Sequence, residues 1–336
     1  MKKAETLNRM MSESERVLVI GGAGYIGSWV TRHLLAEEFK VTVFDNLTFG
    51  GRSLLGVLGH PRYTFIKGDI RDRQALATAM KGIDHVIHLA ALVGEAACDL
   101  SPEVTVAINF EGTKNVVKAA VNQGVRRLIF FSTCSSYGVQ DTDQMATEET
   151  RLNPVSLYAR TKIDAEKFLL DTMKRDLSRT IFRPATVHGP SARMRFDLIV
   201  NHLVCDAVTK HRLSIYGPQM WRPLMWVGDA AKAVELALRA EHSAVRNEVF
   251  NVGATEANYR KGEIGEIVQK RAPTSMNLEY EGTDKDLRSY RVDFSKIKQR
   301  LGFTLSKTLD EAVADLFQLF AAGVIHDPDS SEYRNA

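Results

Sequence analysis

The sequence feature that most constrains the fold is a glycine-rich turn at residues 21–27, Gly-Gly-Ala-Gly-Tyr-Ile-Gly. It follows the apolar run 17–20 and precedes an amphipathic segment that extends to about residue 38, which predicts a strand, a tight turn and a helix start. Glycine permits a sharp turn, a close approach of the backbone to a pyrophosphate and tight packing of helix on strand, and free N–H groups at the helix N-terminus suit phosphates. The turn therefore predicts a dinucleotide site that includes Gly21, Gly24, Tyr25, Ile26 and Gly27.

Glycine-rich turns also join ordinary strands to helices, so the next predicted strand matters. Residues 40–44 form a short β-branched and aromatic run that ends in Asp45. An acid about 20 residues after the turn, at the carboxyl end of a strand, is placed to accept hydrogen bonds from the adenosine ribose, and it would repel a 2′-phosphate. This pattern favours NAD over NADP. The alternative, that Asp45 and Asn46 merely begin a turn, stays open.

Composition limits the class of protein. The 336 residues, 44% of them hydrophobic and 25% charged, are typical of a soluble globular protein larger than one domain. The formal net charge is only +3 and no long basic run occurs, which argues against a nucleic-acid partner. Cys98, Cys134 and Cys205 are spaced neither as disulfide pairs nor as metal ligands. We therefore expect no metal site and a reducing, cytoplasmic location.

The two ends of the chain are polar. Residues 1–15 lack the apolar region of a signal peptide and predict a disordered leader, and residues 327–336 predict a loose tail. No apolar run is long enough to span a bilayer, so no membrane association is expected.

Between these ends, short apolar strands alternate with helical segments. Strands are expected at 63–67, 83–90, 126–131 and 180–183, and helices at 72–80, 102–123 and 154–174. This alternation predicts an α/β fold with a doubly wound parallel (Rossmann-type) sheet over residues 16–189.

Residues 190–326 are less regular and predict mainly a smaller C-terminal substrate-binding lobe. Helices are expected at 196–209, 227–240 and 309–321, and strands at 213–216 and 248–252. The strand at 248–252 is a candidate to return to the main sheet, so we expect the two lobes to interleave.

Polar residues after the strands mark candidate chemistry, because ligands of such sheets lie beyond the carboxyl ends of the strands. The run 132–138, Ser-Thr-Cys-Ser-Ser-Tyr-Gly, follows one predicted strand. Tyr158 and Lys162 lie four residues apart in a predicted helix and so point the same way. A nearby ammonium favours the ionised form of a phenol, whose ordinary pKa is about 10. A bare Y-x-x-x-K also arises by chance on surface helices, but its position after the glycine turn and Asp45 favours catalysis.

With these motifs the chain resembles the extended short-chain dehydrogenase/reductase family, specifically its nucleotide-sugar epimerases, dehydratases and reductases. The resemblance covers about residues 16–320 and rests on eight ordered motifs. They are Gly21-x-x-Gly24-x-x-Gly27, Asp45-Asn46-Leu47, Gly68-Asp69-Ile70, His88-Leu89-Ala90-Ala91, Asn109 before Glu111-Gly112-Thr113, Ser132-Thr133, Tyr158-x-x-x-Lys162 and Arg183-Pro184.

The resemblance implies NAD as the cofactor and roles for the matching residues. Thr133 would hydrogen-bond the sugar oxygen that undergoes redox chemistry, Tyr158 would be the acid/base, and Lys162 would hold the nicotinamide ribose. Thr133 could otherwise only cap its turn, and Asn109 could be only structural. Besides the glycine turn, Tyr158 and Lys162, the implied cofactor-binding residues are Asp45, Asn46, Asp69, Ile70, Leu89, Ala90, Ala91 and Asn109.

Departures from the family pattern bear on the reaction. The 4,6-dehydratases usually carry Asp and Glu after the catalytic Thr, where this chain has Cys134 and Ser135. The groups that eliminate water are therefore missing, and the same lack of Glu argues against the sugar-acid decarboxylases. Cysteine is a second acid/base in some epimerases, but we interpret Cys134 as a buried inert thiol.

Arginines are expected to bind the substrate phosphates. Arg222 matches the family position that contacts the nucleotide diphosphate, a group that suits a guanidinium. A second phosphate arginine of related epimerases is Thr283 here, and Arg288 or Arg291 is a candidate to replace it. Arg195 lies where relatives bind the nucleobase and sugar. The predicted substrate-binding residues are therefore Thr133, Cys134, Ser135, Arg195, Arg222 and Arg288.

Together these features predict an NAD-dependent 4-epimerase that acts on a nucleotide-diphosphate sugar through a transient 4-keto intermediate. A nucleotide-sugar 4-ketoreductase, a nucleotide-sugar dehydratase and a catalytically silent NAD-binding sensor remain as alternatives. In the family, helices equivalent to 102–123 and 154–174 form a four-helix interface, which implies a homodimer.

Overall fold

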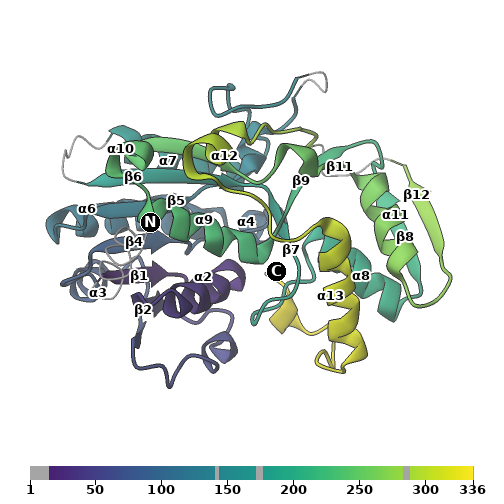
Figure 1. The fold of residues 1–336 in the computed structure, drawn as a ribbon, viewed down its shortest axis with the longest axis horizontal. Helices are drawn as coiled ribbons and strands as arrows, with labels where there is room; N and C mark the ends of the chain where they lie inside the picture. Colours follow the sequence, from purple (N-terminus) through teal and green to yellow (C-terminus); the bar gives the residue numbers. More distant parts are fainter. Residues whose placement is uncertain (1–14, 141–143, 172–176, 283–287, 336) are drawn as a thin grey trace, which may run out of the picture.

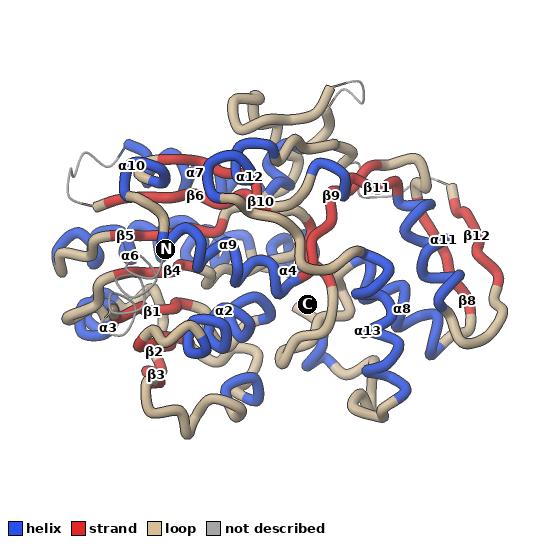
Figure 2. Tube along the Cα trace, viewed as in Figure 1, coloured by secondary structure: helices blue, strands red, loops and turns tan. Residues whose placement is uncertain are grey.

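The centre of the molecule is a seven-stranded parallel sheet in the order β10-β6-β5-β4-β1-β2-β3 (Figures 1 and 2). The structure, a computed structural model, describes residues 15–140, 144–171, 177–282 and 288–335. The strand order reverses between β1 and β4, and sheets of this kind bind ligands at that point. The predicted fold class is confirmed. The strands are β1 (Arg16–Ile20), β2 (Lys40–Asp45), β3 (Tyr63–Lys67), β4 (His85–His88), β5 (Arg127–Phe131), β6 (Ser178–Pro184) and β10 (Glu248–Val252).

Both faces of this sheet are covered by helices. Val17 and Val19 of β1 pack in the core that contains α2 (Tyr25–Ala36) and α9 (Val227–Arg239). Leu18 and Ile20 point to the opposite core, because side chains alternate along a strand. That core is closed by α3 (Arg73–Ala79), α6 (Thr113–Asn122) and α7 (Leu157–Asp171). The run 17–20 is thus apolar throughout because both of its faces are buried.

The helix predicted at 102–123 is divided in the structure. It comprises α5 (Pro102–Val106), a π-helical segment at Ala107–Gly112, and α6, and α4 (Glu95–Leu100) precedes it. π-helical turns are often found at functional sites. Here the turn carries Asn109, whose side chain reaches the loop after β4.

The remaining elements form a smaller lobe, at the right of the sheet in Figure 1. A three-stranded sheet contains β7 (Thr186–His188), β9 (Trp221–Trp226) and β11 (Asn258–Arg260), and a two-stranded sheet pairs β8 (Arg212–Tyr216) with β12 (Asn277–Glu281). Its core is built largely on α8 (Ile199–Thr209), α11 (Lys261–Arg271) and α13 (Leu309–Ala321). The short helices α10 (His242–Val245) and α12 (Ser295–Leu301) lie near the end of the main sheet beside β6 and β10.

β10 runs parallel to β6 in the main sheet, as its sequence suggested, so a strand from the later part of the chain completes the nucleotide-binding half. The sequence did not predict β7, β9, β11, β12, α11 or α12. Strand β9 contains Pro223, which argues against a strand on sequence grounds, and β7 and β11 are only three residues long. Their pairing depends on neighbours distant in the chain.

The end of the chain differs from the predicted loose tail. Tyr333 packs its ring on buried Phe196, with ring centroids 5.4 Å apart, and its carbonyl accepts a hydrogen bond from the Phe196 N–H. The aromatic contact supplies apolar burial that the polar composition of the segment does not suggest. Of the predicted leader, residues 1–14 lie outside the described residues, as does Thr283.

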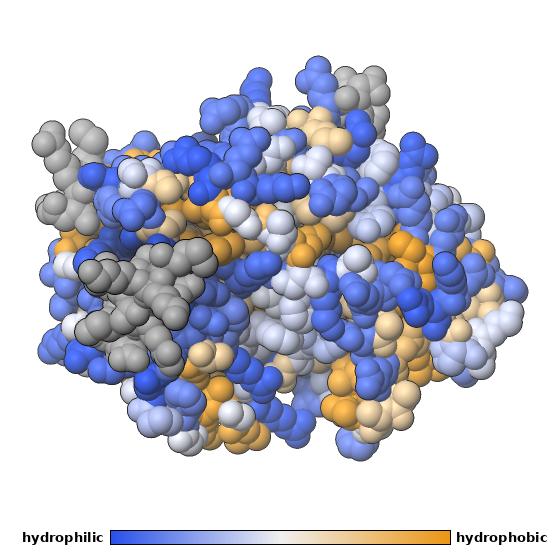
Figure 3. Space-filling view, in the orientation of Figure 1, coloured by the Kyte–Doolittle hydropathy of each residue, from blue (hydrophilic) through white to orange (hydrophobic). Residues whose placement is uncertain are grey.

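The face of the molecule in Figure 3 is mainly hydrophilic, and its apolar atoms occur in separate groups. Within the described ranges, no helix has the combination of length and apolarity needed to cross a membrane.

Candidate active site

A cavity of about 620 Å³ lies at the carboxyl ends of the parallel strands and extends to the smaller lobe. Ligand sites are typically concave and mainly apolar, with a few placed polar groups. All predicted site residues line this cavity except Asn109 and Cys134. From the nucleotide-binding half these are Gly21, Gly24, Tyr25, Ile26, Gly27, Asp45, Asn46, Asp69, Ile70, Leu89, Ala90, Ala91, Thr133, Ser135, Tyr158 and Lys162, and from the rest of the chain Arg195, Arg222 and Arg288.

The glycine turn forms a cradle that side chains would fill. Gly21 has φ of +86°, and a Cβ on it would lie 2.6 Å from the backbone nitrogen of Ala90. A Cβ on Gly27 would lie 2.1 Å from the Gly21 carbonyl oxygen. Glycine is therefore required at both positions, and the free space beside the turn suits a pyrophosphate.

Asp45 stabilises this turn from the end of β2. Its carboxylate accepts hydrogen bonds from the Ala23 N–H (3.0 Å) and the Leu47 N–H (2.8 Å). Burial raises the pKa of Asp45, and these two backbone bonds oppose the shift. Each oxygen keeps a further lone pair, so the carboxylate can also accept from ribose hydroxyls.

Asp69 lies at the neighbouring strand end, after β3. Arg71 donates to both of its oxygens, at 2.9 and 2.7 Å, and holds the pKa of Asp69 down to about 2. Asn46 donates to Asp69 as well. The cavity wall expected to bind the adenosine is therefore braced by hydrogen bonds between the loops after β2 and β3.

The three candidate catalytic residues meet at the ends of β5 and α7. Thr133 is the residue that caps the short helix Cys134–Tyr137, and its Oγ accepts from the Ser135 N–H at 3.1 Å. The Thr133 hydroxyl lies near enough to the Tyr158 phenol to favour its ionised form. Burial raises the pKa of Tyr158 to about 12, while Arg195, Thr133 and Arg288 oppose the rise. Tyr158 is thus a neutral phenol at neutral pH in this state.

Lys162 lines the same cavity as Tyr158 and also packs on an aromatic ring. Its Nζ lies 4.2 Å from the centroid of the Phe130 ring, and the positive charges that act on Tyr158 are those of Arg195 and Arg288. Burial lowers the pKa of Lys162 to about 7, against the opposing effect of Glu166. A buried amine of this kind is desolvated, and an aromatic face stabilises it.

Ser135 joins two distant parts of the chain. Its Oγ accepts a hydrogen bond from Arg288 Nη1 at 3.0 Å and lies 3.5 Å from the Tyr290 hydroxyl. Arg222, in β9, donates to the backbone carbonyls of Trp221 and Arg288. Arg222 and Arg288 are therefore held together near Thr133, as a clamp for phosphate requires.

Arg195 pairs with Asp197, with hydrogen bonds of 3.0 and 2.5 Å. Burial raises the pKa of both Tyr158 and Tyr25, and the positive charge of Arg195 opposes this rise. The Arg195 guanidinium therefore lies close to the site of the expected chemistry.

Cys134 and Asn109 have other roles than binding. The Cys134 thiol donates to the Arg183 carbonyl at 3.1 Å, and burial raises its pKa well above the ordinary value, which makes it an inert packing residue. The Asn109 side chain accepts from the Leu92 N–H, donates to the Leu92 carbonyl and donates to Thr161. Asn109 positions the loop after β4 against α7 and does not itself line the cavity.

The cavity also contains residues that the sequence reasoning missed. Arg193, His202, Lys261, Tyr290 and Asn335 line it and come from four separate parts of the chain. Arg193 lies in the basic segment Arg-Met-Arg at 193–195, which was the only sequence signal for it. Nothing in the sequence pattern linked Lys261 or Asn335 to the site.

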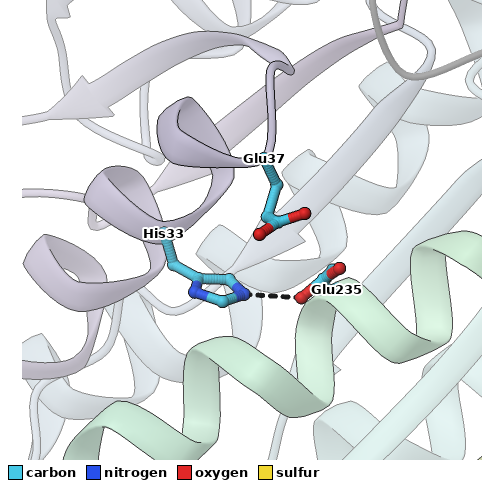
Figure 4. A group of neighbouring side chains, drawn as sticks. All are labelled: His33, Glu37 and Glu235. Atoms are coloured by element: carbon cyan, nitrogen blue, oxygen red, sulfur yellow. Dashed lines mark hydrogen bonds and ion pairs between the residues drawn. The ribbon is translucent and has the colours of Figure 1, made fainter. Parts of the chain in front are cut away.

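One group of metal-ligating side chains lies outside the cavity. His33 of α2 and Glu37, which directly follows α2, face Glu235 of α9, and His33 Nε2 lies 2.7 Å from a Glu235 oxygen (Figure 4). Arg239 pairs with both glutamates, at 2.7 and 2.8 Å. The group therefore forms an ion-pair network that joins two helices.

Comparison with known proteins agrees with this fold. Residues 17–253 match the family described as the NAD dependent epimerase/dehydratase family. The chain is similar to a dTDP-glucose 4,6-dehydratase of Streptomyces griseus, with 31% identity over 89% of this chain and 92% of the relative. It is similar to a UDP-glucose 4-epimerase of Lactobacillus helveticus, with 30% identity over 89% of this chain and 95% of the relative.

Among solved structures, the fold is similar to DesIV, a dTDP-glucose 4,6-dehydratase from Streptomyces venezuelae, in a structure with NAD and TYD bound. The TM-score is 0.83 at 27% identity, over 94% of this chain and 100% of that chain. The protein belongs to the NAD dependent epimerase/dehydratase family, within the extended short-chain dehydrogenases/reductases that act on nucleotide sugars, and its cofactor is NAD.

Proposed function

We propose that the protein is a nucleotide-sugar 4-epimerase. The observation that carries the proposal is the combination of an intact Thr133, Tyr158 and Lys162 with a position beside Thr133 that lacks acid groups. Carboxylates among the described cavity-lining residues are Asp45 and Asp69, at the cofactor end, and Asp197, which is paired with Arg195. Redox chemistry at the sugar is therefore supported, whereas elimination of water has no proton carriers next to the reacting carbons.

Each residue has a defined part in this proposal. NAD supplies a hydride acceptor and donor for the sugar C4. Tyr158 takes the proton of the C4 hydroxyl and returns it, and Thr133 holds the same oxygen as its charge changes. Because burial raises the pKa of Tyr158, the charges of Arg195 and Arg288 and the Thr133 hydroxyl are needed to stabilise the phenolate.

The substrate phosphates are assigned to the pair Arg222 and Arg288. Arg222 is only 5% exposed and lines the cavity, and Arg288 is joined to it through its backbone carbonyl. Their position next to Ser135 leaves the sugar between the diphosphate and Tyr158.

The test is incubation of the NAD-loaded protein with UDP-, dTDP-, GDP- and CDP-hexoses in deuterated buffer, followed by NMR. A 4-epimerase interconverts C4 epimers without net NADH production and keeps the original hydrogen at C4. Deuterium at C5 with loss of the 6-hydroxyl would instead indicate a dehydratase. Consumption of NADH only with a keto sugar would indicate a reductase, and binding without turnover a sensor.

We also propose a cytoplasmic homodimer. Leu100 of α4, Val104 of α5 and Leu170 of α7 are 77%, 39% and 42% exposed on helices that contact one another. Val116 and Val117 of α6 and Leu169 of α7 are buried against the sheet. A monomer at all concentrations in sedimentation experiments, or no effect of Leu170→Lys on a dimer, would contradict this interface.

A further inference from the structure

Arg193 is a buried guanidinium that forms no ion pair with a carboxylate among the residues that the structure describes. It is 6% exposed and lines the cavity, and its Nε is buried with no hydrogen-bond partner. The nearby Asp197 is paired with Arg195. Burial, with the charge of Arg195, lowers the pKa of Arg193 to about 10. A buried charge of this kind is unfavourable unless an anion compensates it, so the cavity beside Arg193 is prepared for an anion.

Two contacts fix the Arg193 side chain. Its Cζ lies 4.2 Å from the centroid of the Phe49 ring, in the loop after β2, and its Nη2 donates to the Arg334 carbonyl at 3.0 Å. Neither partner neutralises the charge. Both orient a planar group whose remaining N–H donors suit bidentate recognition of phosphate.

The backbone before Arg193 is attached to the first turns of α2, the helix that begins at the glycine turn. Tyr25 donates its hydroxyl proton to the Gly189 carbonyl at 2.6 Å, and Ser191 donates to the Tyr25 carbonyl at 2.8 Å. Trp29 donates to the Pro190 carbonyl at 2.9 Å. Arg193 is thereby held beside the glycine turn. The pair Arg222 and Arg288, next to Ser135, is a separate group of arginines from a later part of the chain.

Residues 331–335 form a strap that joins the lobes at this place. Glu332 pairs with Arg52 at 2.9 Å, Tyr333 packs on Phe196, and the Asn335 amide donates to the Val93 carbonyl, after β4, at 3.1 Å. Asn335 lines the cavity and its Oδ1 is a second buried polar atom without a partner. In Figure 1 the yellow end of the chain lies between the sheet and the smaller lobe.

We propose that Arg193 binds the pyrophosphate of NAD beside the glycine turn, and that the strap at residues 331–335 holds its guanidinium in place. Arg193 contacts Phe49 of the loop after β2, and the turn after β1 and the loop after β4 are joined to its neighbours at residues 189–191 and to Asn335. The pyrophosphate of a dinucleotide lies where these strands end. The proposal is independent of which sugar reaction is catalysed.

The experiment is calorimetric titration of NAD-free protein with NAD, ADP-ribose, adenosine and UDP. The variants are Arg193→Met, which keeps volume and removes charge, Arg193→Lys, and a chain that ends at Tyr333, which removes the Arg334 carbonyl and Asn335. The control is Arg271→Met, whose exposed side chain pairs with Asp310 on the surface. Thermal unfolding is measured for each variant.

Arg193→Met should weaken NAD and ADP-ribose binding about tenfold to hundredfold, since hydrogen bonds to charged groups are of this strength, and leave adenosine and UDP unchanged. Arg193→Lys should lose less NAD affinity than Arg193→Met. The shortened chain should also bind NAD more weakly than the wild type. If Arg193→Met fails to fold, the lysine variant and the shortened chain carry the test. Weaker UDP binding with unchanged NAD binding would overturn the proposal, as would unchanged binding of all four ligands.

Discussion

The two sides of the cavity are built in different ways. On the cofactor side, the glycine turn, Asp45 and Asp69 lie within 50 residues, and each lies at the carboxyl end of its own strand of one sheet. On the substrate side, Ser135, Arg195, Arg222 and Arg288 come from four separate segments, and Ser135 and Arg288 are 153 residues apart. The difference shows that local backbone geometry forms the cofactor side, whereas long-range contacts between polar groups assemble the substrate side.

The largest expected effect is at the border between the two sides. Tyr158→Phe removes the proton carrier and should lower kcat by about 10²–10⁴-fold, the usual contribution of a general acid or base. Binding of NAD and of nucleotide sugar should persist, because the ring is kept. Turnover is measured by NMR and binding by calorimetry. Turnover near the wild-type value would contradict the assignment of Tyr158.

Gly27→Ala should weaken cofactor binding without affecting the residues expected to bind the substrate. The added Cβ would lie 2.1 Å from the Gly21 carbonyl oxygen, so the turn must shift, and NAD affinity should fall by about tenfold or more. Gly59→Ala is the control, because its Cβ would have no neighbour within 4 Å. NAD titration compares the two variants. Equal NAD affinities would show that the turn does not bind the cofactor closely.

Arg222→Met should weaken substrate binding without affecting cofactor binding. We expect KM for the nucleotide sugar to rise about tenfold or more, because a charged hydrogen bond to phosphate is lost, with NAD affinity unchanged. Since Arg222 also donates to two backbone carbonyls, thermal unfolding is measured in parallel. A fall in kcat at constant KM would instead place Arg222 in the chemistry.

Lys162→Met should stabilise the NAD-free protein by about 1–2 kcal/mol at pH 7 while removing activity, the usual trade-off at functional sites. The folded pKa of Lys162, about 7, lies below the unfolded value of 10.5, so the folded state binds fewer protons between these values. Wild-type stability should therefore rise with pH across this window, and the advantage of the variant should shrink there.

Denaturant unfolding from pH 6 to 10 measures this effect, with the exposed Lys81→Met as the control. A constant difference between Lys162→Met and the wild type over this range would mean that Lys162 stays charged in the folded protein.

The smallest effect is expected outside both sides of the cavity. Glu235→Gln weakens the network of His33 and Arg239 between α2 and α9, and partly exposed ion pairs of this kind contribute about 0–1 kcal/mol. EDTA should change neither the melting temperature nor turnover. A drop in melting temperature on chelation would show that His33, Glu37 and Glu235 hold a metal.

Sequence reasoning succeeded where function and backbone geometry depend on neighbours in the chain. The seven-stranded sheet, the position of Asp45 beside the turn and the place of Thr133 after β5 were all predictable, because apolar periodicity and glycine spacing fix them. It did not predict that Lys162 Nζ packs on the Phe130 ring or that Tyr333 packs on Phe196. Burial and distant partners decide both.

The amino-acid sequence by itself determined the parallel sheet and a dinucleotide turn, since both follow from residues that are close along the chain. Only the tertiary structure decided which charges share the cavity: Arg288 reaches Ser135, and Asn335 reaches Val93 across 242 residues. Contacts over such separations depend on how the lobes pack. This packing produces no periodic pattern in the sequence of either segment.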